Sequence, residues 1–342
     1  MAESSSSVAP TSTESIAPAP ALRRKSWAAK LGFPLAVAAA YGIHAYISRE
    51  APPLEARHYS IFLAVLGGLG LLAAVLQLFL PRFRRWMEEM WPILAAGVLV
   101  FAVIEFITDG LRMLGMQLLE LPYFPGPPKI LQSAVDDRVL LWESTYHSLF
   151  LLGRGYLLGV LLGLVTGVSI GWFRTARYWG MPVMKIVGPI PATAWIPLAL
   201  VLLDSATLAA VRLIAIAVWF PVTMLTASGI ANTRSSYLDV ARTLGAKPSY
   251  LIFRVAIPAA MPNIFLGLFM GLGAAFLTLV VAETVGVKSG LGWYLGWARE
   301  WGEYGKVFAA LGIMAIFFST IMTGLFALRD RVLVWQKGTI KW

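Results

Sequence analysis

Long apolar stretches separated by short polar segments are the main feature of the chain. Eight of them run to about 18–25 residues, which is enough for a helix to cross a hydrocarbon layer of about 30 Å. The predicted spans are residues 31–48, 59–80, 91–113, 147–172, 181–203, 207–230, 260–283 and 307–328. The pattern therefore predicts an all-α integral membrane protein with about eight spans.

The composition supports this class and excludes others. Hydrophobic residues make up 58% of the chain and charged residues only 13%, whereas soluble domains average about 45–50% and about 25%. The chain has no cysteine, and its three histidines are too scattered in sequence to suggest a metal cluster. Disulfides, thiolate metal sites and cysteine nucleophiles are therefore excluded. In a membrane protein the net charge of +10 indicates basic residues kept on the cytoplasmic side, and we expect no nucleic acid partner.

Basic residues also predict the orientation. Seventeen of the 28 Lys and Arg residues lie in segments that an inner N-terminus would place in the cytoplasm, and eight lie in outer segments. This excess predicts that both termini are cytoplasmic and that the number of crossings is even. Residues 1–26 are rich in Ser, Ala and Pro and have no apolar periodicity. We expect them to form a disordered cytoplasmic tail.

The cytoplasmic segment between the sixth and seventh spans, residues 234–258, has a regular pattern of its own. Ser235 or Ser236 is expected to cap a first short helix, which would end at Gly245, a C-cap with positive φ. A second helix would begin at Pro248. Apolar residues recur on one face of the two helices, namely Leu238, Ala241, Leu244, Leu251, Ile252 and Val255. We expect a helix–glycine–helix element along the membrane that offers an apolar face to a cytosolic partner; the alternative is an ordinary interfacial helix pair.

The spacing within this segment resembles a known loop. Permease subunits of bacterial ABC importers carry Glu-Ala-Ala, three residues, Gly, nine residues and Ile-x-Leu-Pro. Here the chain has Asp239-Val-Ala, three residues, Gly245, nine residues and Val255-Ala-Ile-Pro, so Asp replaces Glu and Val replaces the first Ala. The resemblance implies that the loop docks into a groove of an ATP-hydrolysing subunit. The residues implied in this coupling are Leu238, Asp239, Ala241, Arg242, Leu244, Gly245, Ala246, Leu251, Val255 and Pro258.

Three other segments are similar to permeases for nitrate, aliphatic sulfonates, taurine and bicarbonate. They are residues 189–198 (Pro-Ile-Pro-Ala-Thr-Ala-Trp-Ile-Pro-Leu), residues 124–127, and residues 282–283 followed by 289–292. The resemblance implies the six-helix core of a type I ABC importer permease at residues 91–342, preceded by an additional transmembrane hairpin at residues 27–90.

The same resemblance implies the partners. They are a second copy of the chain, a cytosolic ABC ATPase that binds ATP and Mg²⁺, and an extracytoplasmic substrate-binding protein. The expected cargo is a small anion, the expected location is the bacterial inner membrane, and no cofactor is expected in this chain.

Prolines and charges within the spans mark a candidate translocation path. The prolines of the fifth span predict either a broken helix whose freed backbone groups line the path, or a kink that packing tolerates. Trp195 could serve the path or face lipid. Arg212 and Arg154 could attract an anion, reach the interface or pair with an acid, and Glu283 could act in gating or accept a hydrogen bond in a dimer interface. The candidate path residues are Pro189, Pro191, Trp195, Pro197, Arg212 and Glu283.

Two further patterns are expected to serve packing. Glycine recurs every four residues at positions 155, 159, 163, 167 and 171, which permits close approach of another helix. Glu105 and Asp109 lie four residues apart, as in a packed polar stripe.

No motif indicates that this chain is an enzyme. A Gly-x-x-x-x-Gly-Lys-Ser/Thr loop for ATP phosphates is absent from the sequence, so the energy is expected to come from another subunit. The alternative function is a secondary transporter or channel that works without ATP, which predicts inverted repeats and ion-coupling acids at mid-membrane depth. Neither feature is convincing in the sequence.

Overall fold

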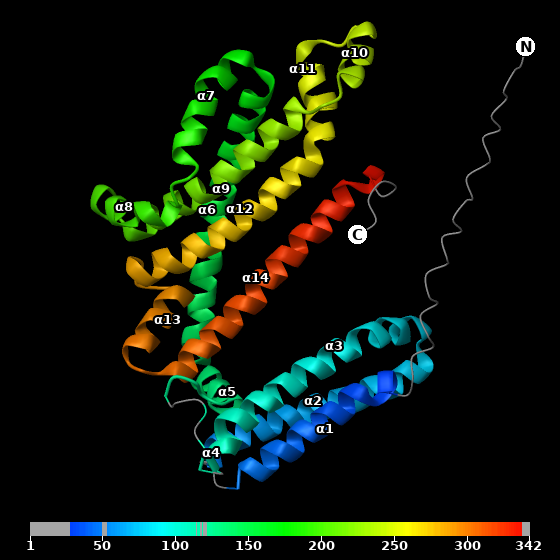
Figure 1. Cartoon of the computed structure of the whole chain (residues 1–342), viewed down its shortest axis with the longest axis vertical. Helices are drawn as coiled ribbons and strands as arrows, with labels where there is room; N and C mark the ends of the chain where they lie inside the picture. Colours follow the sequence, from blue (N-terminus) through cyan, green and yellow to red (C-terminus); the bar gives the residue numbers. More distant parts are fainter. Residues whose placement is uncertain (1–27, 50–52, 114, 117, 119–121, 337–342) are drawn as a thin grey trace, which may run out of the picture. The chain divides into compact units, whose positions relative to one another are not determined.

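The computed structural model describes residues 28–49, 53–113, 115–116, 118 and 122–336. Within these residues every regular element is a helix, as the hydropathy pattern predicts (Figure 1). The expected disordered tail, residues 1–26, lies outside the described residues. The chain divides into two compact units, Met1–Met113 and Leu114–Trp342, which are described separately.

The first unit contains three long helices, α1 (Ala28–Ile47), α2 (Pro53–Phe79) and α3 (Pro81–Glu105). The third continues into a π-helical turn, η1 (Phe106–Gly110), and the short α4 (Leu111–Met113). Phe33 of α1 packs edge-on against Trp91 of α3, with ring centroids 5.7 Å apart. The domain boundary expected near residue 90 falls inside α3, and α3 packs with α1 and α2. A hydrophobic cluster shared by α1 and α3 explains why this compact unit continues to Met113.

The second unit holds the remaining helices. In chain order they are α5 (Pro127–Asp136), α6 (Arg138–Trp172), α7 (Arg174–Val187), η2 (Ala192–Trp195), α8 (Ile196–Leu202), α9 (Ala206–Ala231), α10 (Ser235–Thr243), α11 (Pro248–Tyr250), η3 (Leu251–Ala256), α12 (Ile257–Val285), α13 (Leu291–Glu300), α14 (Tyr304–Val332) and η4 (Val334–Gln336). Within this unit α10 lies at one end and α13 at the other (Figure 1).

The lengths and apolar composition of the helices are those of a membrane protein, but they do not give a single number of spans. Six helical segments of the described chain are long and apolar enough to cross a membrane. A seventh candidate is the pair formed by residues 174–187 and 192–202, which is bent by 79°. Leu31–Ile47 is a shorter apolar helix. The expected total of eight requires that both of these cross, and it stays a prediction.

A glycine seam joins α6 to α9 along most of their lengths. A Cβ built at Gly159 would lie 2.6 Å from the carbonyl oxygen of Ala215, and one built at Gly163 would lie 2.7 Å from the Cβ of Val222. Gly155, Gly167 and Gly171 are similarly close to α9. The prediction that these glycines serve close helix packing is therefore confirmed.

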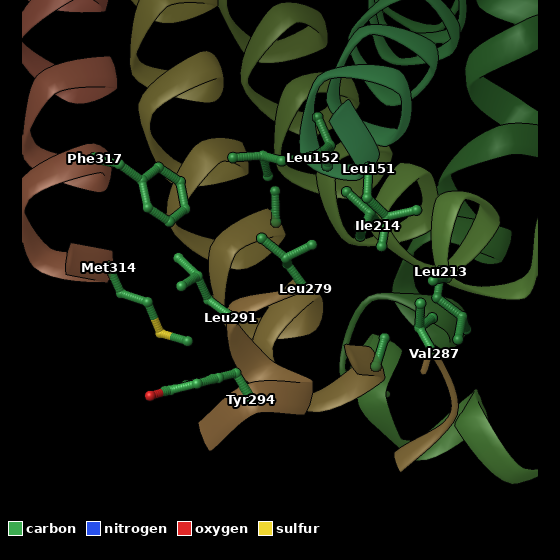
Figure 2. Close-up of a cluster of buried hydrophobic side chains, with 14 of the residues drawn as sticks. Leu151, Leu152, Leu213, Ile214, Leu279, Val287, Leu291, Tyr294, Met314 and Phe317 are labelled. Carbon is green, nitrogen blue, oxygen red and sulfur yellow. The ribbon is translucent and has the colours of Figure 1, made fainter. Parts of the chain in front are cut away.

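The largest hydrophobic cluster lies at the α13 end of the second unit. Figure 2 shows its side chains converging from α6, α9, α12, α13 and α14. The labelled members are Leu151, Leu152, Leu213, Ile214, Leu279, Val287, Leu291, Tyr294, Met314 and Phe317. This cluster and the glycine seam fix α9 and α12, the two helices that line the site described next.

Candidate functional site

The candidate site begins where the fifth apolar stretch breaks. The α7 helix ends at Val187, and the chain turns through residues 188–191 before η2 and α8 begin. Pro189 and Pro191 have no N–H group to continue a helix. At Gly188 a Cβ would collide with the ring of Phe220, so this glycine lets the break approach α9 closely. A broken helix is thus present, as the prolines predict.

A cavity of about 300 Å³ lies against this break. One wall is formed by residues of the broken segment, among them Gly188, Pro191 and Thr193. The other walls come from α9, with Phe220 at their centre, and from α12, with Met270 as one of its lining residues. Because the lining residues fall near the middle of α9 and α12, the cavity lies about half-way along these spans.

The cavity wall is mostly apolar. Among its described lining residues only Thr193 and Thr278 have polar side chains, and none is charged. The Thr278 hydroxyl donates a hydrogen bond to the Ala274 carbonyl at 2.8 Å, so it is already satisfied within its own helix. The site can therefore surround a small molecule with apolar groups and a few polar ones, as small-molecule sites commonly do, but it supplies no countercharge.

Glu283 lies outside this cavity and serves a different local structure. Its side chain is 1% exposed. Oε1 accepts a hydrogen bond from the Ser148 hydroxyl at 2.7 Å, and Oε2 accepts one from the Gly292 amide at 2.8 Å. The Ser148 oxygen in turn accepts from the Leu291 amide at 2.8 Å. The carboxylate therefore holds the N-terminus of α13 against α6 and α12, where the helix dipole favours an acid.

Gly290 and Gly292 make this arrangement possible. Gly290 has a φ of 99°, and a Cβ there would meet Oε1 of Glu283. At Gly292 a Cβ would lie 2.6 Å from the Val280 carbonyl oxygen. The far side of α13 is fixed by Tyr294, whose hydroxyl donates to Oδ2 of Asp137 at 2.8 Å. Burial raises the pKa of Tyr294 above its ordinary value, so the phenol remains a donor.

The α10 helix and the turn after it form the second candidate region. The Gly245 amide donates to the Arg242 carbonyl at 2.9 Å, and the Ala246 amide donates to the Ala241 carbonyl at 3.0 Å. Gly245 has a φ of 79°. This pair of bonds with a left-handed residue is the Schellman motif, and it ends α10 where the glycine predicts. Asp239 accepts from Arg242 at 2.9 Å, an exposed pair within one helical turn.

The residues expected to form one apolar face of this region divide into two groups. Leu251 is buried, and Leu238, Ala241, Ile252 and Val255 are half-buried. Leu244, in contrast, is 82% exposed. The other large apolar side chains exposed here are Tyr237, Val240, Tyr250 and Phe253, none of which was among the predicted coupling residues. The predicted face mostly anchors the element, and a different set of side chains is available to a partner.

Two details of the predicted loop were wrong. The N-cap of α10 is Arg234, which makes no side-chain cap hydrogen bond, so neither Ser235 nor Ser236 caps the helix. The second helix is not a separate surface helix, because α11, η3 and α12 follow one another without a break and form one candidate span, Pro248–Val285. A π-helical turn at η3 precedes Pro258, so the proline does not end the helix.

A family comparison decides what class of protein this is. The family model described as "Binding-protein-dependent transport system inner membrane component" matches residues 159–333. The chain belongs to this family. The match includes the cavity, the α10 region and Glu283, so both candidate regions belong to the permease domain.

Sequence identity to individual permeases supports the family assignment. The permease is 31% identical over 245 residues to SsuC of Bacillus subtilis (strain 168), named as an aliphatic sulfonates transport permease protein; the match covers 71% of this chain and 88% of SsuC. It is 26% identical over 260 residues to the taurine transport system permease protein TauC of Escherichia coli (strain K12), covering 74% and 94% of the two chains.

A solved structure supports the fold of the permease. A chain of the MetNI methionine ABC transporter, in an inward-facing conformation, superimposes with a TM-score of 0.50 at 17% identity. The match covers 58% of this chain and 98% of that chain. The all-α permease fold expected from the sequence is confirmed.

Of the six path residues predicted from the sequence, the permease places only Pro191 in the cavity wall. Trp195 is the N-cap of α8, and Pro197 lies in its first turn. Arg212 is exposed in the second turn of α9, and no hydrogen bond or ion pair to it occurs among the described residues. Arg154 lies over the Phe150 ring at 3.8 Å. Sequence reasoning missed Phe220, Met270 and Thr278, because apolar residues within long apolar helices carry no local signal.

Proposed function

We propose that the permease moves a small organic anion through the cavity beside the α7–α8 break, driven by ATP hydrolysis in a cytosolic partner that contacts α10. The observation that carries this proposal is the cavity half-way along the spans, walled by a broken helix. Irregular backbone at membrane depth is tolerated where it lines a path or is covered by protein.

The apolar wall favours one kind of cargo within the expected anion class. Nitrate and bicarbonate have no apolar part, whereas an alkanesulfonate or a similar organic anion has a short chain that this wall can surround. SsuC and TauC are named for such cargo. We therefore place aliphatic sulfonates and related compounds ahead of inorganic anions as cargo of the permease.

The exposed apolar residues around α10 support a protein contact there. Leu244, Val240 and Phe253 are all more than half exposed, and they lie at the end of the unit where α9 ends and α11 begins. With the predicted orientation this end faces the cytoplasm, in reach of an ATPase subunit. Closure of two ATPase subunits would press on α10, and because α11, η3 and α12 are continuous, that movement would reach the cavity wall.

Reconstitution of the permease with its ATPase and binding protein in liposomes tests the proposal. Uptake of a labelled alkanesulfonate should require ATP and all three proteins, and unlabelled sulfonate should compete better than bicarbonate. Uptake by the permease alone, down a gradient and without ATP, would instead identify a secondary transporter or channel.

The contact at α10 can be tested separately because the chain contains no cysteine. A Leu244→Cys variant carrying a photoreactive maleimide should crosslink to the ATPase subunit. Val201→Cys is the matched control, since Val201 is 83% exposed and lies in α8, away from α10. Equal crosslinking at the two positions would contradict a specific contact at α10.

A further inference from the structure

The end of the cavity nearest α10 is formed by large apolar groups. Among the lining residues of α9, Phe220 and Pro221 lie closest to the α10 end of that helix, and Met270 does so among the lining residues of α12. Phe220 also packs against a second hydrophobic cluster, which continues along α9 toward α10 at Met224 and Ala227. Phe220 therefore stands between the cavity and a packed part of the permease.

The Phe220 ring is held on two sides. A Cβ built at Gly188 would collide with Cε2 and Cζ of Phe220, so the tip of the ring rests on the backbone of the break. Gly188 has a φ of −58° and a ψ of −44°, which any residue adopts, so the lack of space calls for glycine here. The buried Met184 of α7 belongs to the cluster that packs against the same ring. Close packing of this kind keeps a ring in one position, and the cavity therefore has a rigid end.

The backbone of α9 supplies an acceptor at the same end. Pro221 has no N–H group, so the Ala217 carbonyl four residues earlier cannot receive its usual helical hydrogen bond. Both residues line the cavity. A carbonyl oxygen without a donor repels the oxygens of a sulfonate, whereas an alkyl group is favoured beside Phe220 and Met270. This end of the cavity therefore suits the alkyl part of an organic anion and not its charged part.

The broken segment supplies a donor for the charged part. Thr193 is half-buried in the cavity wall, and its hydroxyl makes no hydrogen bond to another described residue. A hydroxyl can donate to a sulfonate oxygen. Thr278 differs, because its hydroxyl already donates within α12. Of the two polar side chains in the wall, Thr193 is thus the one available to the charged end of the cargo.

We propose that Phe220 limits the length of the alkyl chain that the permease carries, with the chain end against the ring and the sulfonate away from it. This inference rests on the proposed function, because it requires that cargo passes through the cavity. The volume of about 300 Å³ lies at the lower end of the range for small-molecule sites. We therefore expect short-chain sulfonates to be the preferred cargo.

Uptake of alkanesulfonates from ethanesulfonate to octanesulfonate tests the proposal in the reconstituted system, limited to those that the binding protein binds. With the natural permease, kcat/KM should fall beyond a certain chain length. Phe220→Leu removes the ring tip, and it should raise kcat/KM for the first rejected sulfonate relative to the longest accepted one by about tenfold or more. Phe220→Ala should extend the limit further; if it does not fold, Phe220→Leu decides. An unchanged profile in Phe220→Leu would overturn the proposal.

Three further variants separate the length limit from general effects. Phe276→Leu is the matched control, since Phe276 lies on α12, contacts the rings of Phe317 and Phe318 and is not a lining residue. Its profile should equal that of the natural permease. Thr193→Val should lower kcat/KM for all chain lengths alike, because it removes the donor for the charged end.

Met270→Ala tests the other large side chain at this end. Met270 is 56% exposed and has a flexible side chain that can yield to cargo, so this variant should move the limit less than Phe220→Leu does. An equal or larger shift in Met270→Ala would transfer the role to Met270 and overturn the proposal.

Labelling of the cavity gives a readout that needs no transport, because the chain contains no cysteine. Ala274→Cys places a thiol in the α12 wall of the cavity. Its reaction with n-alkyl methanethiosulfonates, from methyl to octyl, forms a disulfide and releases methanesulfinate. The rate should fall at the chain length that the cavity no longer accepts, and adding Phe220→Leu should move this fall to longer chains. Val201→Cys on the exposed α8 surface gives the intrinsic reactivity and should show no such fall.

The two measurements separate this inference from the proposed function. If the natural permease carries no sulfonate, the proposed function fails, and the labelling profile alone decides whether Phe220 is the end wall of the cavity. If sulfonates are carried but neither profile moves in Phe220→Leu, the inference is overturned while the proposed function stands.

Discussion

The α6–α9 seam and the turn after α10 both depend on glycine, but for different physical reasons. At Gly159 the backbone is helical, and the space for a side chain is absent because the Ala215 carbonyl oxygen lies 2.6 Å from a built Cβ. At Gly245 the space is open, with nothing within 4 Å of a built Cβ, but φ is 79°. The first glycine is required by a neighbouring helix and the second by its own backbone.

The difference separates the part of the permease that packs within the chain from the part that meets another protein in the proposed function. The seam fixes one side of α9, while the other side of α9 faces the cavity. The α10 turn holds Leu244 and Val240 in the open, where packing within this chain does not constrain them. Substitutions in the two regions should therefore affect different measurements.

The largest effect is expected from Gly159→Leu. The added side chain must push α6 away from α9, and overpacking of this kind typically costs about 1–3 kcal/mol. We expect a lower unfolding temperature in detergent and a loss of uptake with it. Gly153→Leu on the same helix is the matched control, since nothing lies within 4 Å of a Cβ there. Equal destabilisation by the two variants would show that the seam does not control stability.

Gly245→Pro should abolish ATP-driven uptake with a much smaller change in stability. Proline cannot adopt a positive φ and has no amide to donate to the Arg242 carbonyl, so the turn after α10 is lost. Uptake and ATPase activity in liposomes, together with the unfolding temperature, measure the two effects. Gly245→Asn, which tolerates the left-handed conformation, should retain most of the uptake. Normal uptake by the proline variant would remove α10 from the coupling route.

The sequence locates the glycines of both regions, but it does not predict the helix that follows the α10 turn. The five seam glycines have a strict four-residue spacing, and the turn at Gly245 follows from local backbone rules, so both can be located without a structure. The continuity of α11, η3 and α12 cannot, because Pro248 and Pro258 suggest helix boundaries. A π-helical turn accommodates the second of them.

Contacts between distant residues were the least predictable part of the site. Glu283 could be identified as an acid within a span, but its partner Ser148 is 135 residues away. Glu105 looked like part of a polar stripe with Asp109, whereas its hydrogen-bond partner His44 is 61 residues away on another helix. The cavity wall combines residues from three helices, and no single stretch of sequence contains that information.

The smallest effect is expected from Arg212→Ala, which tests whether a charge outside the cavity helps cargo to reach it. Arg212 is exposed and absent from the cavity wall, so it can act only by attraction through water, which salt screens. We expect the KM for uptake to rise by less than about fivefold at low salt and to be unchanged at high salt, with an unchanged kcat. Arg154→Ala is the variant with which Arg212→Ala is compared, because the Arg154 guanidinium lies over the Phe150 ring. A fall in kcat for Arg212→Ala, insensitive to salt, would instead place this side chain in contact with cargo, and the boundary of the site would have to extend from the apolar cavity to the first turns of α9.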